Sequence, residues 1–350
     1  MKQHKKIEQK VLRVYRKVSP SYREMKTEDD FTSNYLQRKN ILNELSFDEQ
    51  SFKGKTLIDV GGGTGENSLF YALWGAKVTI LEPNEISYDR SADLFKQFRQ
   101  KVNIENKSLF DFDKENLKKF DIVVCDGVLQ HTYNPIKGLE IIASGLKKGA
   151  ILLLSIGEYH GVFKRMLQRK LIFGLAGKNE EKIVSTAKKY FQEHIDRAVR
   201  FGLRLEDSVI YDSYVNPQVM PPKLIDICDV LLRNNVRYLS AYPTLNFFLE
   251  TRPWTQDKVN KFNYEYFKNY YQFLEKIWMT CGEENLEDML KRFDLSAIYK
   301  KITHDADILC RLKDKIEKLS FKDNGLKIIQ KGYLGVGINY FTGVKETVHK

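Results

Sequence analysis

The chain has 350 residues, 42% hydrophobic and 29% charged, with a formal net charge of +11, which suits two domains or one domain with a large insertion. Its four cysteines are widely spaced and form no C-x-x-C pair, which argues against a zinc site and for a reducing cytoplasm. The longest apolar runs are too short to span a membrane, and the Lys-rich start lacks an apolar signal region. We therefore expect a cytoplasmic protein with no membrane partner.

The excess of positive charge has two interpretations. Lys and Arg are partly concentrated in residues 1–26, and the rest of the excess is spread along the chain. A generally Lys-rich composition explains this more simply than a nucleic-acid surface does, but the charge keeps nucleic acid open as a partner.

Helical patterns occupy the first fifty residues. Apolar side chains recur at helical spacing over residues 4–18, opposite a Lys- and Arg-rich face, and Pro20 ends this pattern. A second helix is predicted from about residue 34 to 45. Packing of both helices against a sheet is the plain interpretation of this region.

A strand, turn, helix and strand pattern fills residues 55–82. Its first apolar run ends at Asp59, a glycine-rich loop covers residues 61–65, and its second apolar run ends at Glu82. Glycines let the backbone turn sharply and approach a ligand, and the following helix points its N–H groups at that ligand. An acid placed like Glu82 can accept hydrogen bonds from a ribose. The pattern predicts half of a nucleotide-binding α/β unit.

The spacing of the glycines separates the nucleotide classes. The order G-x-G-x-G at 61, 63 and 65 departs from the dinucleotide pattern G-x-G-x-x-G, and no G-K-[ST] end marks a Walker loop. A nicotinamide oxidoreductase is therefore disfavoured. The run D-V-G-G-G-T-G, with E-P downstream, resembles motif I and the following acid of class I S-adenosylmethionine-dependent methyltransferases. The resemblance implies S-adenosyl-L-methionine as cofactor and methyltransferase activity.

Three more strand patterns follow in the first half of the chain. They cover residues 102–109, 120–125 and 150–156, with helical patterns between them. The run 120–125 is nearly continuous and β-branched, as is typical of the middle of a parallel sheet. Together with the strands of residues 55–82 they predict a Rossmann-like, doubly wound α/β fold, to which the resemblance adds a sixth and a seventh strand.

The remainder of the chain is predicted to be mostly helical. Helices are expected over 162–173, 179–200 and 223–234, with an irregular loop at 211–217, and a helical block covers 255–320. We predict four parts along the chain. Residues 1–50 form an N-terminal helical lid over the cofactor, and residues 51–160 form the cofactor-binding core. Residues 161–332 form a substrate-side helical region with a strand at 235–241, and residues 333–345 form a closing strand.

Roles for particular residues are implied by the resemblance. The glycine loop would pack against the methionine and ribose, and Glu82 would hold the ribose hydroxyls. Ser108, where Asp is commoner, and Leu109 would border the adenine, and Asp126 would meet the methionine ammonium or the methyl group. The predicted cofactor-binding residues are Asp59, Gly61, Gly62, Gly63, Gly65, Glu82, Pro83, Ser108, Leu109, Asp126 and Gly127.

Three residues are candidates for work on the methyl acceptor. The phrase D-G-V-L-Q-H-T, residues 126–132, resembles the loop after strand four of many small-molecule and RNA-modifying methyltransferases. His131 on this loop is the candidate general base, because an unperturbed imidazole titrates near neutral pH; capping of the next helix is its alternative. Tyr159 and His160 follow the fifth strand and are candidate acceptor-facing groups. No acidic pair or His cluster has metal-ligand spacing.

Three functions remain open from the sequence. The first is transfer of a methyl group to an O or N atom of a small or medium-sized metabolite. The second is the same chemistry on tRNA or another nucleic acid. The third is a methyltransferase-like protein that binds ligands without catalysis, against which the intact glycine loop argues.

Overall fold

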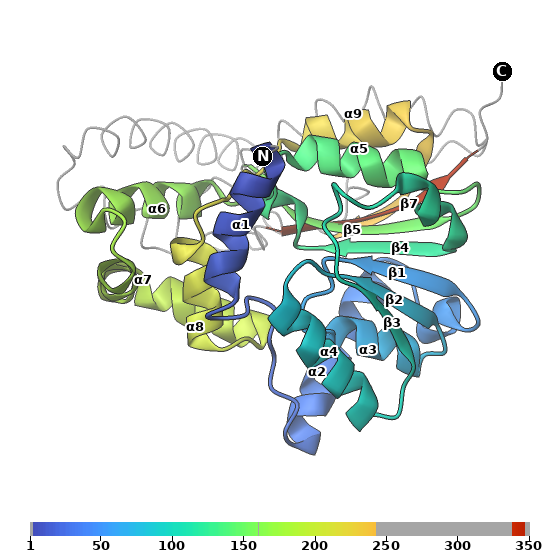
Figure 1. Ribbon diagram of the computed structural model, residues 1–350, viewed down its shortest axis with the longest axis horizontal. Coiled ribbons are helices and arrows are strands. Elements are labelled where there is room, and N and C mark those ends of the chain that lie inside the picture. Colours follow the sequence, from blue (N-terminus) through green and yellow to red (C-terminus); the bar gives the residue numbers. More distant parts are fainter. Residues whose placement is uncertain (1–2, 160, 243–337, 347–350) are drawn as a thin grey trace, which may run out of the picture.

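The computed structural model describes residues 3–159, 161–242 and 338–346. Within this part of the chain, seven strands form one sheet with helices on both faces, and further helices extend beyond one end of the sheet (Figure 1). The strands are β1 (Thr56–Val60), β2 (Lys77–Leu81), β3 (Val102–Glu105), β4 (Ile122–Asp126), β5 (Ile151–Gly157), β6 (Val236–Tyr242) and β7 (Ile338–Lys345). The main helices are α1 (Gln3–Tyr15), α2 (Glu28–Glu44), α3 (Glu66–Leu73), α4 (Glu85–Gln97), α5 (Pro135–Gly145), α6 (Phe163–Ala176), α7 (Glu180–Gly202), α8 (Glu206–Ile210) and α9 (Leu224–Arg233).

The strand order confirms the predicted fold class. The sheet runs β3-β2-β1-β4-β5-β7-β6. Strands β1 to β5 pair in parallel, and β7 is antiparallel to both of its neighbours, β5 and β6. The order reverses between β1 and β4, and in open α/β sheets ligands bind outside the carboxyl ends of the strands at such a point.

Successive side chains along the central strands point to opposite faces of the sheet, which divides the core into two layers. In β4, Val123 and Cys125 join the cluster formed with α5 and α9, whereas Ile122 and Val124 face the cluster formed with α2 and α3. This is the period of two expected of a strand buried on both faces. Figure 1 shows α5 and α9 on one face of the sheet and α2, α3 and α4 on the other.

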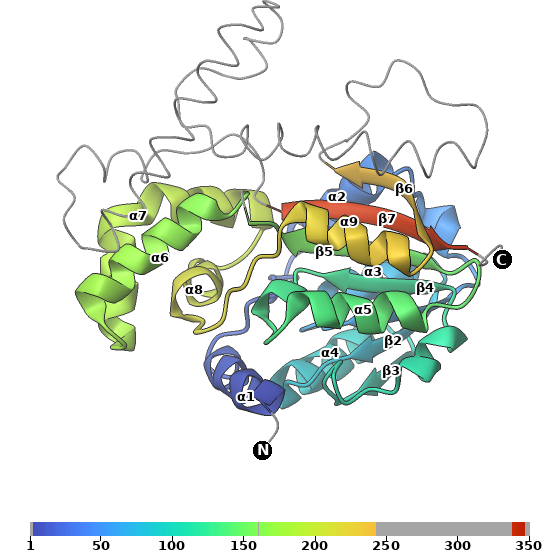
Figure 2. The same ribbon diagram turned by 90° about the horizontal axis from the view of Figure 1, so that it is seen from above.

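A separate helical part packs beside the sheet. Helices α6, α7 and α8 share their own hydrophobic cluster, which includes Leu167, Ile183 and Val209. Both views place this group beyond one end of the sheet, with α1 between the two parts (Figures 1 and 2). Glu8 of α1 contacts Ser108 on the sheet side, and Tyr15 of α1 contacts Asp212 on the helical side. Helix α1 therefore connects the core to the helical part.

Several element boundaries differ from the prediction. Helix α2 begins six residues before the expected start at residue 34, because Thr27 caps it in a capping box with Asp30. Strand β3 ends at Glu105 instead of reaching residue 109. The expected irregular loop at 211–217 is wrong for its first part, since Tyr211–Val215 forms a π-helical turn that continues α8. The whole span between β6 and β7, residues 243–337, lies outside the described residues, and the predicted helical block 255–320 lies within it.

Candidate active site

The turn between β1 and α3 brings three segments into close contact. Gly61 and Gly63 adopt left-handed backbone conformations, with φ of +73° and +59°. A Cβ on Gly61 would lie 2.5 Å from Cγ2 of Val128, and one on Gly63 would lie 2.2 Å from Oγ of Ser21. Both the dihedral angles and the close neighbours require glycine at these two positions.

Glu82 lies directly beside this glycine turn at the end of β2. Its Oε2 accepts a hydrogen bond from the backbone N–H of Gly63 at 3.0 Å, and its Oε1 accepts one from the N–H of Asn84 at 2.9 Å. The side chain is buried, and burial raises its pKa to about 7, although the two backbone hydrogen bonds act to lower it. Glu82 is therefore a buried carboxyl group that is partly ionised near neutral pH.

The segment after β3 forms a wall with helix α1. Ser108 and Leu109 are both buried. The Ser108 hydroxyl donates a hydrogen bond to the carboxylate of Glu8, and the N–H of Phe110 donates to Ser108 Oγ at 3.2 Å. The position predicted to border adenine is thus covered by an N-terminal helix, a contact that nothing in the local sequence indicates.

Asp126, at the end of β4, is held by an arginine from α2. Arg38 donates from Nη1 to Oδ2 of Asp126 at 2.7 Å, and Asn67 Nδ2 lies 3.4 Å from the same oxygen. Arg38 is only 4% exposed. Burial raises the pKa of Asp126, but the charge of Arg38 outweighs it and leaves the pKa below its usual range. A second arginine, Arg23, donates to Asn67 Oδ1 at 3.0 Å. No pattern in the sequence marks either arginine as a site residue.

These groups line one cavity of about 700 Å³. That volume lies within the usual range for small-molecule sites, roughly 300–1,000 Å³. The predicted site residues that the structure brings together in its wall are Gly61, Gly62, Gly63, Glu82, Pro83, Ser108, Leu109, Asp126, Gly127 and His131.

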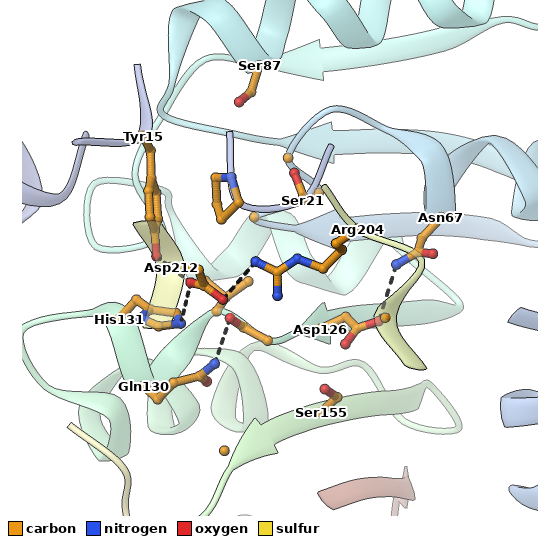
Figure 3. A pocket seen from close by; sticks show the side chains of 18 of the residues that line it. Tyr15, Ser21, Asn67, Ser87, Asp126, Gln130, His131, Ser155, Arg204 and Asp212 are labelled. Atoms are coloured by element: carbon orange, nitrogen blue, oxygen red, sulfur yellow. Dashed lines mark hydrogen bonds and ion pairs between the residues drawn. The ribbon is translucent and has the colours of Figure 1, made fainter. Parts of the chain in front are cut away.

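A cluster of polar side chains lines the same cavity next to the helical part, and we call Tyr15, His131, Arg204 and Asp212 the Asp212 cluster (Figure 3). Tyr15 donates its hydroxyl hydrogen to Asp212 Oδ1 at 2.9 Å, and Arg204 donates from Nη2 to Oδ2 at 2.9 Å. Burial alone would raise the pKa of Asp212, but Arg204 and His131 bring it to about 2. The carboxylate is therefore ionised throughout the physiological range.

His131 is held on both edges of its ring. Its Nε2 lies 3.4 Å from Asp212 Oδ1, and its Nδ1 lies 2.8 Å from Asn216 Nδ2 and 3.2 Å from the carbonyl oxygen of Gln218. Burial lowers the pKa of His131, although the negative charge of Asp212 acts to raise it. A neutral ring with its hydrogen on Nε2, facing Asp212, leaves Nδ1 to accept from the Asn216 amide.

Three of the described predicted residues, Asp59, Gly65 and Tyr159, are not part of this cavity wall. Asp59 accepts a hydrogen bond from Ser68 Oγ at 2.6 Å, and burial raises its pKa to about 6. Gly65, at φ of +87°, is the N-cap of α3. Tyr159 packs its ring edge-on against Phe163. These residues support the elements around the cavity, and His160 lies outside the described residues.

The described part of the chain shows no metal site and no helix that could span a membrane. Among residues 3–159, 161–242 and 338–346, no group of three or more His, Cys, Asp or Glu side chains is arranged to hold a metal ion. No helix in this part of the chain combines the length and apolar character needed to cross a membrane.

Comparison with known sequences identifies the domain around the cavity. Residues 33–185 match the family model described as "Methyltransferase domain". The chain is 30% identical over 113 residues to ubiquinone biosynthesis O-methyltransferase of Coxiella burnetii, covering 32% of this chain and 48% of the relative. It is 34% identical over 107 residues to tRNA U34 carboxymethyltransferase of Campylobacter fetus, covering 28% and 35%. The chain thus spans less than half the length of these curated relatives.

Comparison with solved structures gives partial matches. One is PKMT2 from Rickettsia typhi in complex with AdoHcy, at 12% identity and a TM-score of 0.48, covering 89% of this chain and 54% of that one. Another is magnesium protoporphyrin IX methyltransferase from Synechocystis with bound SAM, at 13% identity and a TM-score of 0.38, covering 67% and 82%. Residues 33–185 therefore carry a methyltransferase domain, and the glycine turn, the acid after β2 and the seven-stranded sheet around it resemble those of class I S-adenosylmethionine-dependent methyltransferases.

Proposed function

We propose that this protein transfers a methyl group from S-adenosyl-L-methionine to an O or N atom of a small or medium-sized metabolite. The observation that carries the proposal is the single cavity that joins the glycine turn and Glu82 to the Asp212 cluster. A cofactor on one side and an acceptor on the other would then meet in one cavity. The 30% identity to an O-methyltransferase of a small molecule supports the same substrate class.

The residues on the cofactor side suit S-adenosylmethionine. Glu82 uses each carboxylate oxygen for one backbone N–H, so each oxygen keeps a lone pair for a ribose hydroxyl. Asp126 offers a carboxylate for the methionine ammonium, and Arg23 in the same wall offers a guanidinium for the methionine carboxylate. Gly61 and Gly63 leave room for the cofactor to approach the backbone.

The protein's own tasks are to position the acceptor, exclude water and remove a proton. The cofactor, when bound, supplies a methyl group on a sulfonium that needs no further activation. His131 lines the cavity and would accept the acceptor's proton at Nδ1, which lies 3.2 Å from the carbonyl oxygen of Gln218. Asp212, facing Nε2, would stabilise the imidazolium that results.

Two measurements test this function. Isothermal titration calorimetry with S-adenosylhomocysteine tests the cofactor site, and absence of binding to the wild-type protein would overturn the proposal. Incubation of cell extract with radiolabelled S-adenosylmethionine, followed by separation into metabolite, RNA and protein fractions, tests the acceptor class. We expect label in the metabolite fraction, and a His131→Gln variant should lower its amount without changing S-adenosylhomocysteine affinity.

The second candidate function is modification of tRNA. The similarity to a tRNA-modifying enzyme and the net charge of +11 favour it. Binding to phosphates would weaken steeply with added salt, because each contact releases counterions. Label in the RNA fraction, together with salt-sensitive RNA binding, would select this function over the first.

A further inference from the structure

Four side chains form a closed cycle of polar contacts around His131, and we call Tyr15, His131, Asp212 and Asn216 the His131 network. The Tyr15 hydroxyl donates to Asp212 Oδ1 at 2.9 Å, and the same oxygen lies 3.4 Å from His131 Nε2 (Figure 3). The Asn216 amide Nδ2 lies 2.8 Å from His131 Nδ1 and donates to the Tyr15 hydroxyl at 2.6 Å. Only His131 lies within residues 33–185, so the other three come from outside the matched domain.

The charges that act on His131 come from the helical part of the chain. Arg169 of α6 and Arg204, between α7 and α8, act to lower its pKa, and Asp212 acts to raise it. Burial lowers the pKa most, so the imidazole is uncharged at pH 8. An uncharged imidazole has one hydrogen, on Nδ1 or on Nε2, and only the other nitrogen can accept a proton.

The contacts of the His131 network determine where this hydrogen lies. The backbone N–H of Gln218 donates to Asn216 Oδ1 at 3.0 Å, so the amide nitrogen of Asn216 faces Tyr15 and His131. Burial and the charge of Asp212 raise the pKa of Tyr15 well above its ordinary value, so its hydroxyl stays protonated and donates to Asp212. Asn216 then donates to His131 Nδ1, and the hydrogen of His131 lies on Nε2.

The opposite tautomer of His131 would gain one partner and create two conflicts. Its Nδ1 hydrogen could be donated to the carbonyl oxygen of Gln218, 3.2 Å away. That hydrogen would face the amide hydrogens of Asn216, and the Nε2 lone pair would face the carboxylate of Asp212. The pKa of Asp212 is about 2, so this carboxylate stays ionised and repels the lone pair. Asn216 and Asp212 therefore select the tautomer whose basic nitrogen is Nδ1.

A buried arginine fixes the turn that carries Asp212 and ends at Asn216. Arg169 donates from Nη1 to the carbonyl oxygen of Ser213 at 2.7 Å and from Nη2 to that of Asn216 at 2.6 Å. The turn is π-helical, a rare form that occurs frequently at functional sites. Asn216 has no exposed surface and does not line the cavity, so it can act on a ligand only through its neighbours.

We propose that Tyr15 and Asn216 are positioning residues that hold the general base His131 as the tautomer with its hydrogen on Nε2. Asn216 acts on Nδ1 directly, and Tyr15 acts by joining the Asn216 amide to Asp212. This inference rests on the proposed function for the role of His131 as the base. The tautomer is a property of the protein itself and can be measured without cofactor, acceptor or turnover.

This tautomer leaves both hydrogens of the protonated base with a partner. The O–H or N–H bond of the methyl acceptor breaks, its electron pair stays on the acceptor atom, and the proton bonds to Nδ1. The imidazolium then faces the carbonyl oxygen of Gln218 with Nδ1 and the carboxylate of Asp212 with Nε2. Hydrogen bonding of the charged form favours its formation.

The tautomer is measured by two-bond ¹H–¹⁵N correlation NMR on the full chain labelled with ¹⁵N-histidine, at pH 8. The spectrum separates a protonated ring nitrogen from an unprotonated one. His131→Gln removes one set of signals among those of the six histidines and so identifies His131. We expect wild-type His131 to carry its hydrogen on Nε2, and a hydrogen on Nδ1 would overturn the inference.

Two variants test the positioning residues. Asn216→Asp replaces the amide donor by a carboxylate of the same shape, which cannot donate to Nδ1 and attracts a hydrogen there, so Nδ1 should become protonated at pH 8. Tyr15→Phe removes a hydrogen bond to the charge of Asp212, so that charge acts more strongly on His131, whose pKa in an NMR titration should rise by about one unit. Each variant should also lower kcat about tenfold or more, with unchanged S-adenosylhomocysteine affinity.

The matched control is Tyr211→Phe. Tyr211 belongs to the same turn as Asp212, but its hydroxyl donates to Glu180 Oε1 at 2.7 Å and it does not line the cavity. The substitution removes the same atom and one hydrogen bond. The tautomer and pKa of His131 and the value of kcat should all equal those of the wild type.

Further outcomes decide the inference. An unprotonated Nδ1 in Asn216→Asp, or an unchanged His131 pKa in Tyr15→Phe, would refute the role of that residue. An equal rise of the pKa in Tyr211→Phe would refute the role of Tyr15, because the effect would then be general loosening of the turn. If Asn216→Asp does not fold, the wild-type tautomer and Tyr15→Phe decide. Full activity of His131→Gln would refute the base in the proposed function and leave the tautomer result standing.

Discussion

Replacing Glu82 by Gln tests whether a buried carboxylate holds the cofactor. The folded-state pKa of Glu82 is about 7, above its ordinary value of 4.5. Protonated Glu82 therefore stabilises the fold, fully below pH 4.5, and this contribution is lost as the pH rises through 7. The shift corresponds to about 3 kcal/mol. Ionisation of Glu82, which hydrogen bonds from a ribose diol require, therefore lowers the free energy of unfolding.

The expected effect on binding follows from these values. Below pH 7 the wild-type protein must release a proton to bind S-adenosylhomocysteine, so its affinity should fall about tenfold for each pH unit. Glu82→Gln should weaken binding about 10- to 100-fold at pH 8, because a charge-assisted hydrogen bond contributes about 1.5–3 kcal/mol, and its affinity should not depend on pH near 7.

The stability of the variant separates a ligand effect from misfolding. A glutamine oxygen can accept from only one of the two backbone groups, Gly63 N–H or Asn84 N–H, and the orphaned donor costs about 1–3 kcal/mol. Removal of the buried charge offsets this cost at pH 8, so the melting temperature should change little.

Calorimetry at pH 5.5 to 8.5, in buffers of different ionisation enthalpy, measures both affinity and proton release. The control is Glu85→Gln, because Glu85 is exposed at the start of α4 and its side chain is 68% exposed. Wild-type affinity in Glu82→Gln, or an unchanged pH dependence in that variant, would refute the assignment of Glu82 to the cofactor.

Three further predictions follow from the site. Gly63→Ala should lower the free energy of unfolding by about 1–3 kcal/mol because of its left-handed backbone, and by more because the new Cβ would meet the N-terminal segment. It should also weaken S-adenosylhomocysteine binding. The control is Gly54→Ala, at φ of +74°, where a new Cβ would have no heavy atom within 4 Å; in urea denaturation it should show the backbone cost alone. Arg38→Met should cost about 3–5 kcal/mol by leaving Asp126 buried and unpaired, and adding Asp126→Asn should recover most of it; no recovery would contradict the pairing. His131→Gln should reduce kcat about 10²- to 10⁴-fold. Because burial lowers the pKa of His131, the rate of the wild-type enzyme should stay constant through neutral pH and fall only in acid. Full activity in the variant would exclude His131 as the general base.

Local patterns were sufficient to predict the core of the fold. The glycine turn, the acid at Glu82 and the β-branched strand at 120–125 each depend on residues a few positions apart, and the structure has β1, β2 and β4 there. Buried parallel strands read as continuous apolar runs, which makes them the easiest elements to find. Local patterns predict the ends of strands less well, since β3 ends at Glu105 and not at residue 109.

The contacts between distant segments of the cavity wall could not be predicted in the same way. Tyr15 and Asp212 are 197 positions apart, and Arg38 and Asp126 are 88 apart. A buried arginine on a helix looks in sequence like any solvated charge, because only the folded chain supplies its partner. The sequence predicts an irregular loop at 211–217 for the same reason, because the partners of its polar side chains, such as Tyr15 for Asp212, lie far away in the sequence.

The pairing of the last two strands has a consequence for how this architecture can diversify. Tyr242 ends β6 and lies opposite Tyr340 in β7, and both tyrosines line the cavity. Because β7 runs antiparallel to its neighbours, the chain leaves the sheet and re-enters it at the same edge. The entropy of closing a connection grows only slowly with its length, so sequence can be gained or lost between these two anchors at little thermodynamic cost to the sheet. The wall of the cavity can then change near these two tyrosines while strands β1 to β5 stay unchanged.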